Sequence, residues 1–288
     1  MVAFRRKLAE KLFLVGISLL SVLALLPLLH IVASLLVNGG KVLLDAGPRF
    51  LYDVLPPATA TRVEGGIGPA IVGSLLTVLY ASLIALPVSI LVGVFIVEFP
   101  QSSLSSAVRS LIHLLTEFPT VMVGMFSFAV VVVPLGTYSM LAAAFALSLI
   151  MMPYVTSGTE EALRMVPSIY KEAGYALGLR RARVVLKLAM AMARRGVVTA
   201  VLIGVAKAAG ETAALLFTAG RMFYNYPPPL PSEHLFQPVG LIPLLVYYFA
   251  ASPYGVYREV AWGASLVLFL IFLALFISVR RVVKEVRM

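Results

Sequence analysis

Six apolar stretches, each long enough to cross a lipid bilayer as a helix, limit what this chain can fold into. A membrane-spanning helix needs about 20 consecutive, largely apolar residues. The stretches cover residues 12–36, 70–97, 111–133, 135–153, 196–218 and 260–279. Only 12% of the residues are charged, against roughly 25% in an ordinary soluble domain. We therefore predict an all-α membrane protein with six transmembrane helices in a single domain, residues 1–288.

The distribution of basic residues predicts which way the chain crosses the membrane. The net charge is +10, from 23 Lys and Arg against 13 Asp and Glu. In a soluble protein this excess would suggest a nucleic-acid partner, but here the basic residues cluster beside the apolar stretches. With the N-terminus inside, 17 cations fall on the cytoplasmic side and five outside, while Lys207 lies within the fifth stretch. We expect a multi-pass protein of the cell membrane, in contact with lipid rather than nucleic acid, with both termini cytoplasmic.

The sequence also argues against several kinds of chemical site. It contains no cysteine, which excludes disulfides and thiolate metal ligands. His30, His113 and His234 lie in different segments, without the spacing of a metal site. The chain has no G-x-x-x-x-G-K-[ST] loop that would bind nucleotide phosphates. We expect no metal site, no intrinsic cofactor and no catalytic residues.

Two segments outside the apolar stretches have helical character. The predicted cytoplasmic loop 154–195 contains an amphipathic helix, Ser168 to Leu177, with Pro167 at its start and Gly178 in position for a left-handed cap. A short capped helix of this kind is suited to contact a partner. In the long outer loop 219–259, the apolar segment 239–251 is too short to span and is expected to form an interfacial or half-buried helix.

Two ionisable residues fall inside the fifth apolar stretch. Lys207 and Glu211 are four residues apart, which places them on one face of a helix. Charges within a membrane are costly, so they are expected to face a bundle interior, a partner or a water-filled path. One interpretation is that the pair neutralises itself and fixes two helices together. The other is that Lys207 lowers the barrier to an oxyanion, while Glu211 orients the anion or closes a gate.

Four short motifs resemble those of a known family. Glu172, Ala173, Gly174 and Gly178 resemble the E-A-A-x-x-x-G loop of ATP-binding-cassette (ABC) importer permeases. The segments 65–74, 119–124 and 210–220, the last reading GETAALLFTAG, resemble PstA-type permeases of phosphate importers. The similarity extends from about Gly65 to Gly220. The family commonly has Arg where this chain has Lys207, so the cation is retained without its bidentate fork.

The resemblance implies a fold, a mechanism and a set of partners. The fold is that of a type I ABC importer permease, with a cytoplasmic coupling helix between the fourth and fifth transmembrane helices. Glu172, Ala173, Gly174 and Gly178 would receive work from a separate ATPase, and Lys207, Glu211 and Thr212 would lie on the translocation pathway.

The implied function is alternating-access import of inorganic phosphate by a subunit that is not itself an enzyme. The implied partners are a PstC-type permease, a dimeric PstB-type ATP-binding subunit that uses ATP and Mg, and an external PstS-type phosphate-binding protein.

Other functions stay open on the sequence alone. The same architecture could import another oxyanion, such as sulfate or molybdate. A secondary transporter or channel would need no ATPase, which the E-A-A-like helix argues against. A membrane enzyme is disfavoured because no nucleophile, base or metal cluster is recognisable. For Glu172, the alternative to ATPase coupling is a solvated carboxylate, free or paired with Arg180 or Arg181.

Overall fold

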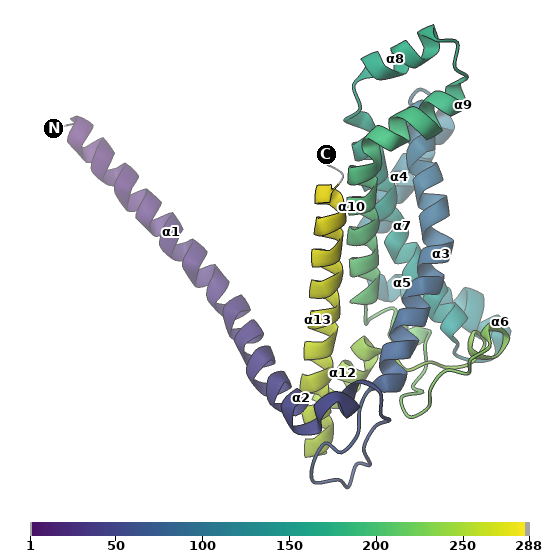
Figure 1. The fold of residues 1–288 in the computed structure, drawn as a ribbon. Coiled ribbons are helices and arrows are strands. Elements are labelled where there is room, and N and C mark those ends of the chain that lie inside the picture. Colours follow the sequence, from purple (N-terminus) through teal and green to yellow (C-terminus); the bar gives the residue numbers. More distant parts are fainter. Residues whose placement is uncertain (1, 286–288) are drawn as a thin grey trace.

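The computed structural model describes residues 2–285, with side chains for 10, 11 and 13–277, and every regular element in this range is helical. Five helices are long and apolar enough to cross a membrane, or six if one bent pair counts as a single span. The long helices are α1 (Val2–Ser34), α3 (Gly68–Glu98), α7 (Met140–Arg164), α10 (Met190–Ala209) and α13 (Gly255–Glu285). Figure 1 shows α3, α7, α10 and α13 side by side, with α8 (Ser168–Ala176) at one end of the bundle and α12 (Ile242–Ala250) toward the other.

Small residues allow the central helices to pack closely. Buried positions recur every fourth residue along one face of α3: Gly73, Thr77, Ala81, Ala85, Ser89 and Gly93. Gly73 faces residues 239 and 240, and Gly93 faces Thr159 of α7. A similar buried series follows α10: Ala193, Val197, Ala200, Gly204 and Ala208. Residues at this spacing share one helix face, and small side chains let two backbones approach. Helix α7 lies between these two faces and is the most buried of the long helices, 67% over its most apolar window against at most 33% for the others.

The third predicted span is not one straight helix. Residues 111–133 are divided between α4 (Ser103–Glu117) and a second segment that contains α5 (Thr120–Ser127), the π-helix η3 (Phe128–Val132) and α6 (Val133–Leu135). The two parts are bent by 106°. Pro119 restricts the residue before it to extended conformations, and Phe118 has φ −67° and ψ 130°.

The fourth predicted span, 135–153, is displaced toward the C-terminus. Its helix, α7, begins after Ser139, whose side chain accepts a hydrogen bond from the Ala142 N–H, and it continues to Arg164. Two polar residues of this extension contact neighbouring helices: Thr156 Oγ1 donates to the Ser89 carbonyl, and Glu160 pairs with Arg109. The predicted loop 154–195 is largely helical, since α7 reaches Arg164 and is followed by α8 and by the helical segment that begins at Arg181.

The fifth predicted span, 196–218, is wrong at its C-terminal end. A continuous helical segment runs from Arg181 through α9 (Arg181–Arg183), the π-helix η4 (Val184–Ala189) and α10, and it ends at Ala209. Residues 210–220 are irregular apart from the short 3-10 helix η5 (Leu215–Phe217). Local hydrogen bonds satisfy this backbone, for example from Leu216 N–H to the Thr212 carbonyl. Irregular backbone is tolerated at membrane depth where protein surrounds it.

Helix α1 stands apart from the rest of the chain (Figure 1). It continues through the π-helix η1 (Leu35–Gly39), α2 (Gly40–Ala46) and the 3-10 helix η2 (Gly47–Leu51), where it joins the bundle. None of its most apolar window is buried. The first predicted span, 12–36, is thus helical, and its apolar surface is open to lipid or to another protein chain.

Hydrogen bonds organise the segments at the α12 end. The predicted helix within 239–251 is confirmed as α12. In α11 (Pro231–His234), the buried His234 ring lies 2.7 Å from the Pro228 carbonyl and 2.9 Å from the Tyr80 hydroxyl. The Tyr226 hydroxyl donates to the Tyr52 carbonyl, and burial raises the pKa of Tyr226. These contacts attach residues 226–234 to α3, through Tyr80, and to Tyr52, which follows η2.

Candidate functional site

The Lys207–Glu211 pair forms at the end of α10. The Lys207 Nζ lies 3.7 Å from Glu211 Oε2. Lys207 belongs to the last turn of the helix, whose partial negative charge favours a cation, whereas Glu211 follows the helix end. The predicted contact is therefore present, although the two residues do not share one helix. Lys207 is 42% exposed and Glu211 only 7%, so the cation is the more accessible charge.

Residues 210–220 are enclosed by segments from elsewhere in the chain. On one side, α5 approaches so closely that a Cβ atom at Gly124 would lie 2.6 Å from the Ala214 Cα. On the other, the Val239 N–H donates to the Ala219 carbonyl over 2.8 Å. Thr212 is partly exposed at the start of this segment. The motifs 119–124 and 210–220, far apart in the sequence, are thus in direct contact.

The third of these motif segments, residues 65–74, is joined to the same region by one hydrogen bond. Ser74 Oγ accepts from the Ile242 N–H over 2.9 Å. Val239, three residues before Ile242, donates to the Ala219 carbonyl. Residues 239–242 therefore connect the first turns of α3 with the end of segment 210–220. The three motif segments 65–74, 119–124 and 210–220 therefore meet on one side of the molecule, toward α12, whereas the fourth motif lies on α8.

Helix α8 has the boundaries that the sequence predicts, to within one residue. It ends in a Schellman motif: the Leu179 N–H donates to the Gly174 carbonyl, and the Gly178 N–H to the Tyr175 carbonyl. Gly178 has φ +74°, a conformation that favours glycine. The predicted left-handed cap is confirmed.

Glu172, Ala173, Gly174 and Gly178 take different positions on this helix. Gly174 is buried against Val184, whereas Glu172, Ala173 and Gly178 are exposed. Large apolar side chains share the exposed surface, with Ile169 67% and Leu177 80% exposed. Helix α8 therefore packs on Val184 through Gly174, and its exposed surface is apolar apart from polar groups that include the Glu172 carboxylate.

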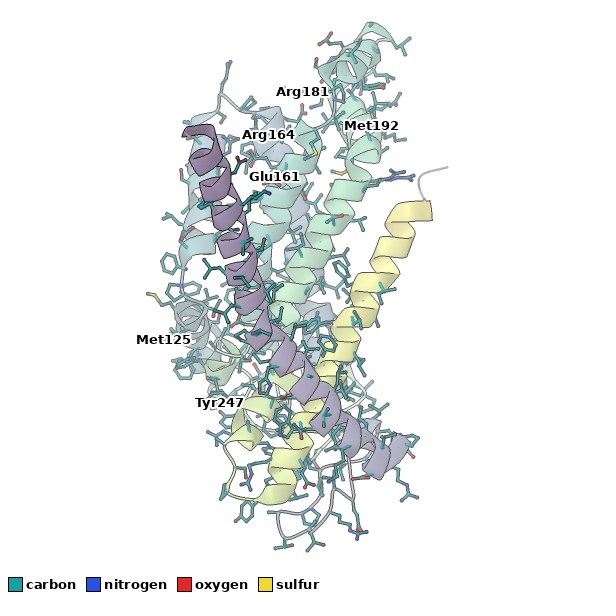
Figure 2. All side chains as sticks on the ribbon, turned by 90° about the vertical axis from the view of Figure 1, so that its left-hand side faces the viewer. Met125, Glu161, Arg164, Arg181, Met192 and Tyr247 are labelled. Carbon is teal, nitrogen blue, oxygen red and sulfur yellow. The ribbon has the colours of Figure 1, made fainter. Side chains whose placement is uncertain are left out.

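Glu98, the last residue of α3, belongs to no motif recognised in the sequence, yet its carboxylate contacts two basic residues at the α8 end. Its Oε1 lies 2.6 Å from Lys171 Nζ, and its Oε2 lies 3.2 Å from Arg181 Nε. Figure 2 shows Arg181 at this end of the bundle. Arg181, one partner considered for Glu172, thus binds Glu98. The available signal was a single carboxylate between an apolar stretch and Phe99-Pro100, in a chain whose neighbouring loops are basic.

A second carboxylate hub lies nearby. Glu160 Oε1 is 2.9 Å from Arg109 Nη2 of α4 and 2.9 Å from Arg164 Nε, one turn along α7. Glu160 therefore joins α4 to α7, and both of these partners lie outside α8. Within the residues that the structure describes, no group of three or more His, Cys, Asp or Glu is placed to hold a metal ion.

Comparison with known proteins identifies the family. Residues 85–288 match the family model described as "Binding-protein-dependent transport system inner membrane component". The chain is 47% identical to the probable phosphate transport system permease protein PstA of Methanocaldococcus jannaschii, over 97% of this chain and 95% of that protein. It is 32% identical to PstA of Haemophilus influenzae, over 94% and 93% of the two chains.

A solved structure supports the same fold. The inward-facing MetNI methionine ABC transporter matches with a TM-score of 0.60 at 19% identity, over 77% of this chain and 95% of that chain. The fold is that of a type I ABC importer permease, as the sequence predicts. The chain belongs to the PstA family of permease proteins, among the inner membrane components of binding-protein-dependent transport systems.

Proposed function

We propose that this chain is the transmembrane permease subunit of an ATP-driven importer of inorganic phosphate. The observation that carries the proposal is 47% identity over 97% of the chain to a protein named as a phosphate transport permease. The geometry agrees with an anionic cargo, because the half-exposed Lys207 ammonium lies beside a segment shared with that family.

In this proposal Lys207, Glu211 and Thr212 lie on the translocation pathway. The Lys207 side chain offers a cation to the anion, and Glu211 competes for that cation at 3.7 Å. When phosphate occupies the path, the ammonium exchanges Glu211 for the phosphate oxygens. When the path is empty, the pair closes again, and the cation keeps a partner in both states.

Helix α8 receives mechanical work from a separate ATP-binding subunit, which makes the α8 end cytoplasmic. Glu172, Ala173, Gly174 and Gly178 form the contact helix. Helix α1 begins and α13 ends toward the same end of the bundle, which agrees with cytoplasmic termini (Figure 1). The remaining partners are a second, PstC-type permease and an external PstS-type phosphate-binding protein. We expect this chain to need no cofactor of its own, and ATP and Mg to be used by the dimeric PstB-type subunit.

Uptake into liposomes tests this function. The chain is reconstituted with its second permease, ATPase and binding protein, and uptake of labelled phosphate, sulfate and molybdate is compared with and without ATP. We expect uptake of phosphate alone, and only with ATP. ATP-driven sulfate or molybdate uptake would contradict the cargo, and ATP-independent flux would contradict the importer mechanism.

A further inference from the structure

Glu98 joins three elements at the α8 end of the molecule. It is the last residue of α3, while Lys171 lies within α8 and Arg181 begins α9. Each carboxylate oxygen is used by a different partner, Oε1 by Lys171 and Oε2 by Arg181. The Glu98 side chain is only 9% exposed. A carboxylate that is shielded from solvent and accepts hydrogen bonds from two cations binds its partners more strongly than an exposed surface ion pair does.

Arg181 makes two further contacts with the same helix end. Its Nη2 donates to the Glu98 backbone carbonyl, and its guanidinium lies 4.5 Å from the centroid of the Phe99 ring. Carboxylate, carbonyl and ring together fix the direction of the guanidinium. Helix α8, through Lys171, and the start of α9, through Arg181, are therefore both attached to the end of α3.

Helix α3 connects this point with the opposite end of the molecule. It has 31 residues without an interruption, a length of about 46 Å at 1.5 Å per residue. Figure 1 shows it running the height of the bundle from α9 toward α12. In its first turns, Ser74 holds the Ile242 N–H. Helix α3, which continues through Pro87, therefore provides a structural connection from Glu98 to residues 239–242, which border segment 210–220.

We propose that Glu98 is a positioning residue for energy coupling, which transfers the movement of α8 to α3 through Lys171 and Arg181. This inference rests on the proposed function, because α8 must be moved by an ATPase. Glu160 provides a matched comparison. It is also a carboxylate with two basic partners at the same end, but those partners lie on α4 and α7.

The test measures labelled phosphate imported per ATP hydrolysed by the complete reconstituted complex. We expect Glu98→Gln to lower this ratio at least tenfold, while the complex still co-purifies with its ATPase. Glu160→Gln should leave the ratio within twofold of the unsubstituted complex. Lys171→Met should lower the ratio as well, and the double variant Glu98→Gln with Lys171→Met should fall no further than the more affected single variant, because the two residues form one contact.

A covalent link separates positioning from a merely structural role. Because this chain has no cysteine, Glu98→Cys with Lys171→Cys introduces its only two thiols, and the complex without these substitutions, treated with the same reagent, is the control for thiols of the other subunits. Joining them with a short bifunctional thiol reagent should restore the ratio to within threefold of the unsubstituted complex, although the charges are gone. If the Glu98→Gln complex fails to assemble, the ratio measured for Lys171→Met decides the test, because Lys171 lies on α8, at the end of the bundle, where a substitution disturbs the packing of the long helices less.

Three results would overturn the inference: an unchanged ratio in Glu98→Gln or in Lys171→Met, equal losses in Glu98→Gln and Glu160→Gln, or no recovery on cross-linking. Each is judged in a complex that imports phosphate with ATP. Absence of ATP-dependent phosphate uptake by the unsubstituted complex would instead overturn the proposed function, and the coupling role with it.

Discussion

Lys207 leaves 42% of its side chain exposed, whereas Glu211 leaves 7%, so an approaching anion meets the cation before the carboxylate. A hydrogen bond to a charged group contributes about 1.5–3 kcal/mol, which corresponds to roughly 10- to 150-fold in rate. We expect Lys207→Met to lower initial phosphate uptake by about that factor, and Lys207→Arg, which keeps the cation, to retain most of it. Equal uptake by the two variants, at equal amounts of assembled complex, would contradict this role.

Glu211→Gln examines the other half of the pair. The variant keeps the size of the side chain and removes its charge, so Lys207 loses its counter-ion in the empty path. We expect uptake to be lost while co-purification with the ATPase is kept. Full uptake by this variant would leave Glu211 outside the mechanism.

Gly178 allows a second test, because its φ of +74° disfavours any residue with a Cβ atom. Gly178→Ala should cost about 1 kcal/mol at the end of α8 and reduce phosphate-stimulated ATPase activity. Gly136→Ala is the matched control, since Gly136 has φ +70° and equally open surroundings but lies far from α8 in the sequence. Similar ATPase activities in the two variants would rule out a specific role for the α8 cap.

Helix packing gives a prediction on the contact between α7 and α10. A Cβ atom at Gly204 would lie 2.6 Å from Val155 Cγ2. Gly204→Leu should therefore destabilise the bundle by about 1–3 kcal/mol through overpacking, and lower the Tm of the purified chain. Ala206→Leu, on the exposed face of the same helix, is the control. A Tm unchanged in both variants would mean that α7 and α10 are less closely packed.

The elements that could be predicted from the sequence are those with local signals. Pro167 and Gly178 mark the two ends of α8, and the structure agrees to within one residue. The end of α10 at Ala209 could not be predicted, because the apolar residues that follow form an irregular segment supported by α5 and residues 239–242. For the same reason Glu98 was missed: its partners are 73 and 83 residues away in the sequence. The spacing of Lys207 and Glu211, a local feature, predicted their contact.

The arrangement of the whole molecule gives a prediction about α1. In the cysteine-free chain, Leu23→Cys places a thiol on this exposed helix, and Leu147→Cys places one in the core, where Leu147 is 1% exposed. We expect a small apolar maleimide to label the first at least about tenfold faster in the purified chain, because buried thiols react only after local opening. Equal, slow labelling would mean that α1 packs against the bundle.

The half-length helix α5 also has a consequence for how the protein is made. Even with η3 and α6, its helical segment covers only residues 120–135, fewer than a bilayer crossing needs, and Gly124 packs against Ala214, which is synthesised much later. Helix α1, in contrast, is long and apolar, and none of its most apolar window is buried in the bundle, so it can enter the membrane as soon as it leaves the ribosome. The order of synthesis is therefore not the order in which segments become stable. The segment around the α4–α5 bend therefore stays incompletely packed in the membrane until residues 210–220 have been synthesised and pack against α5.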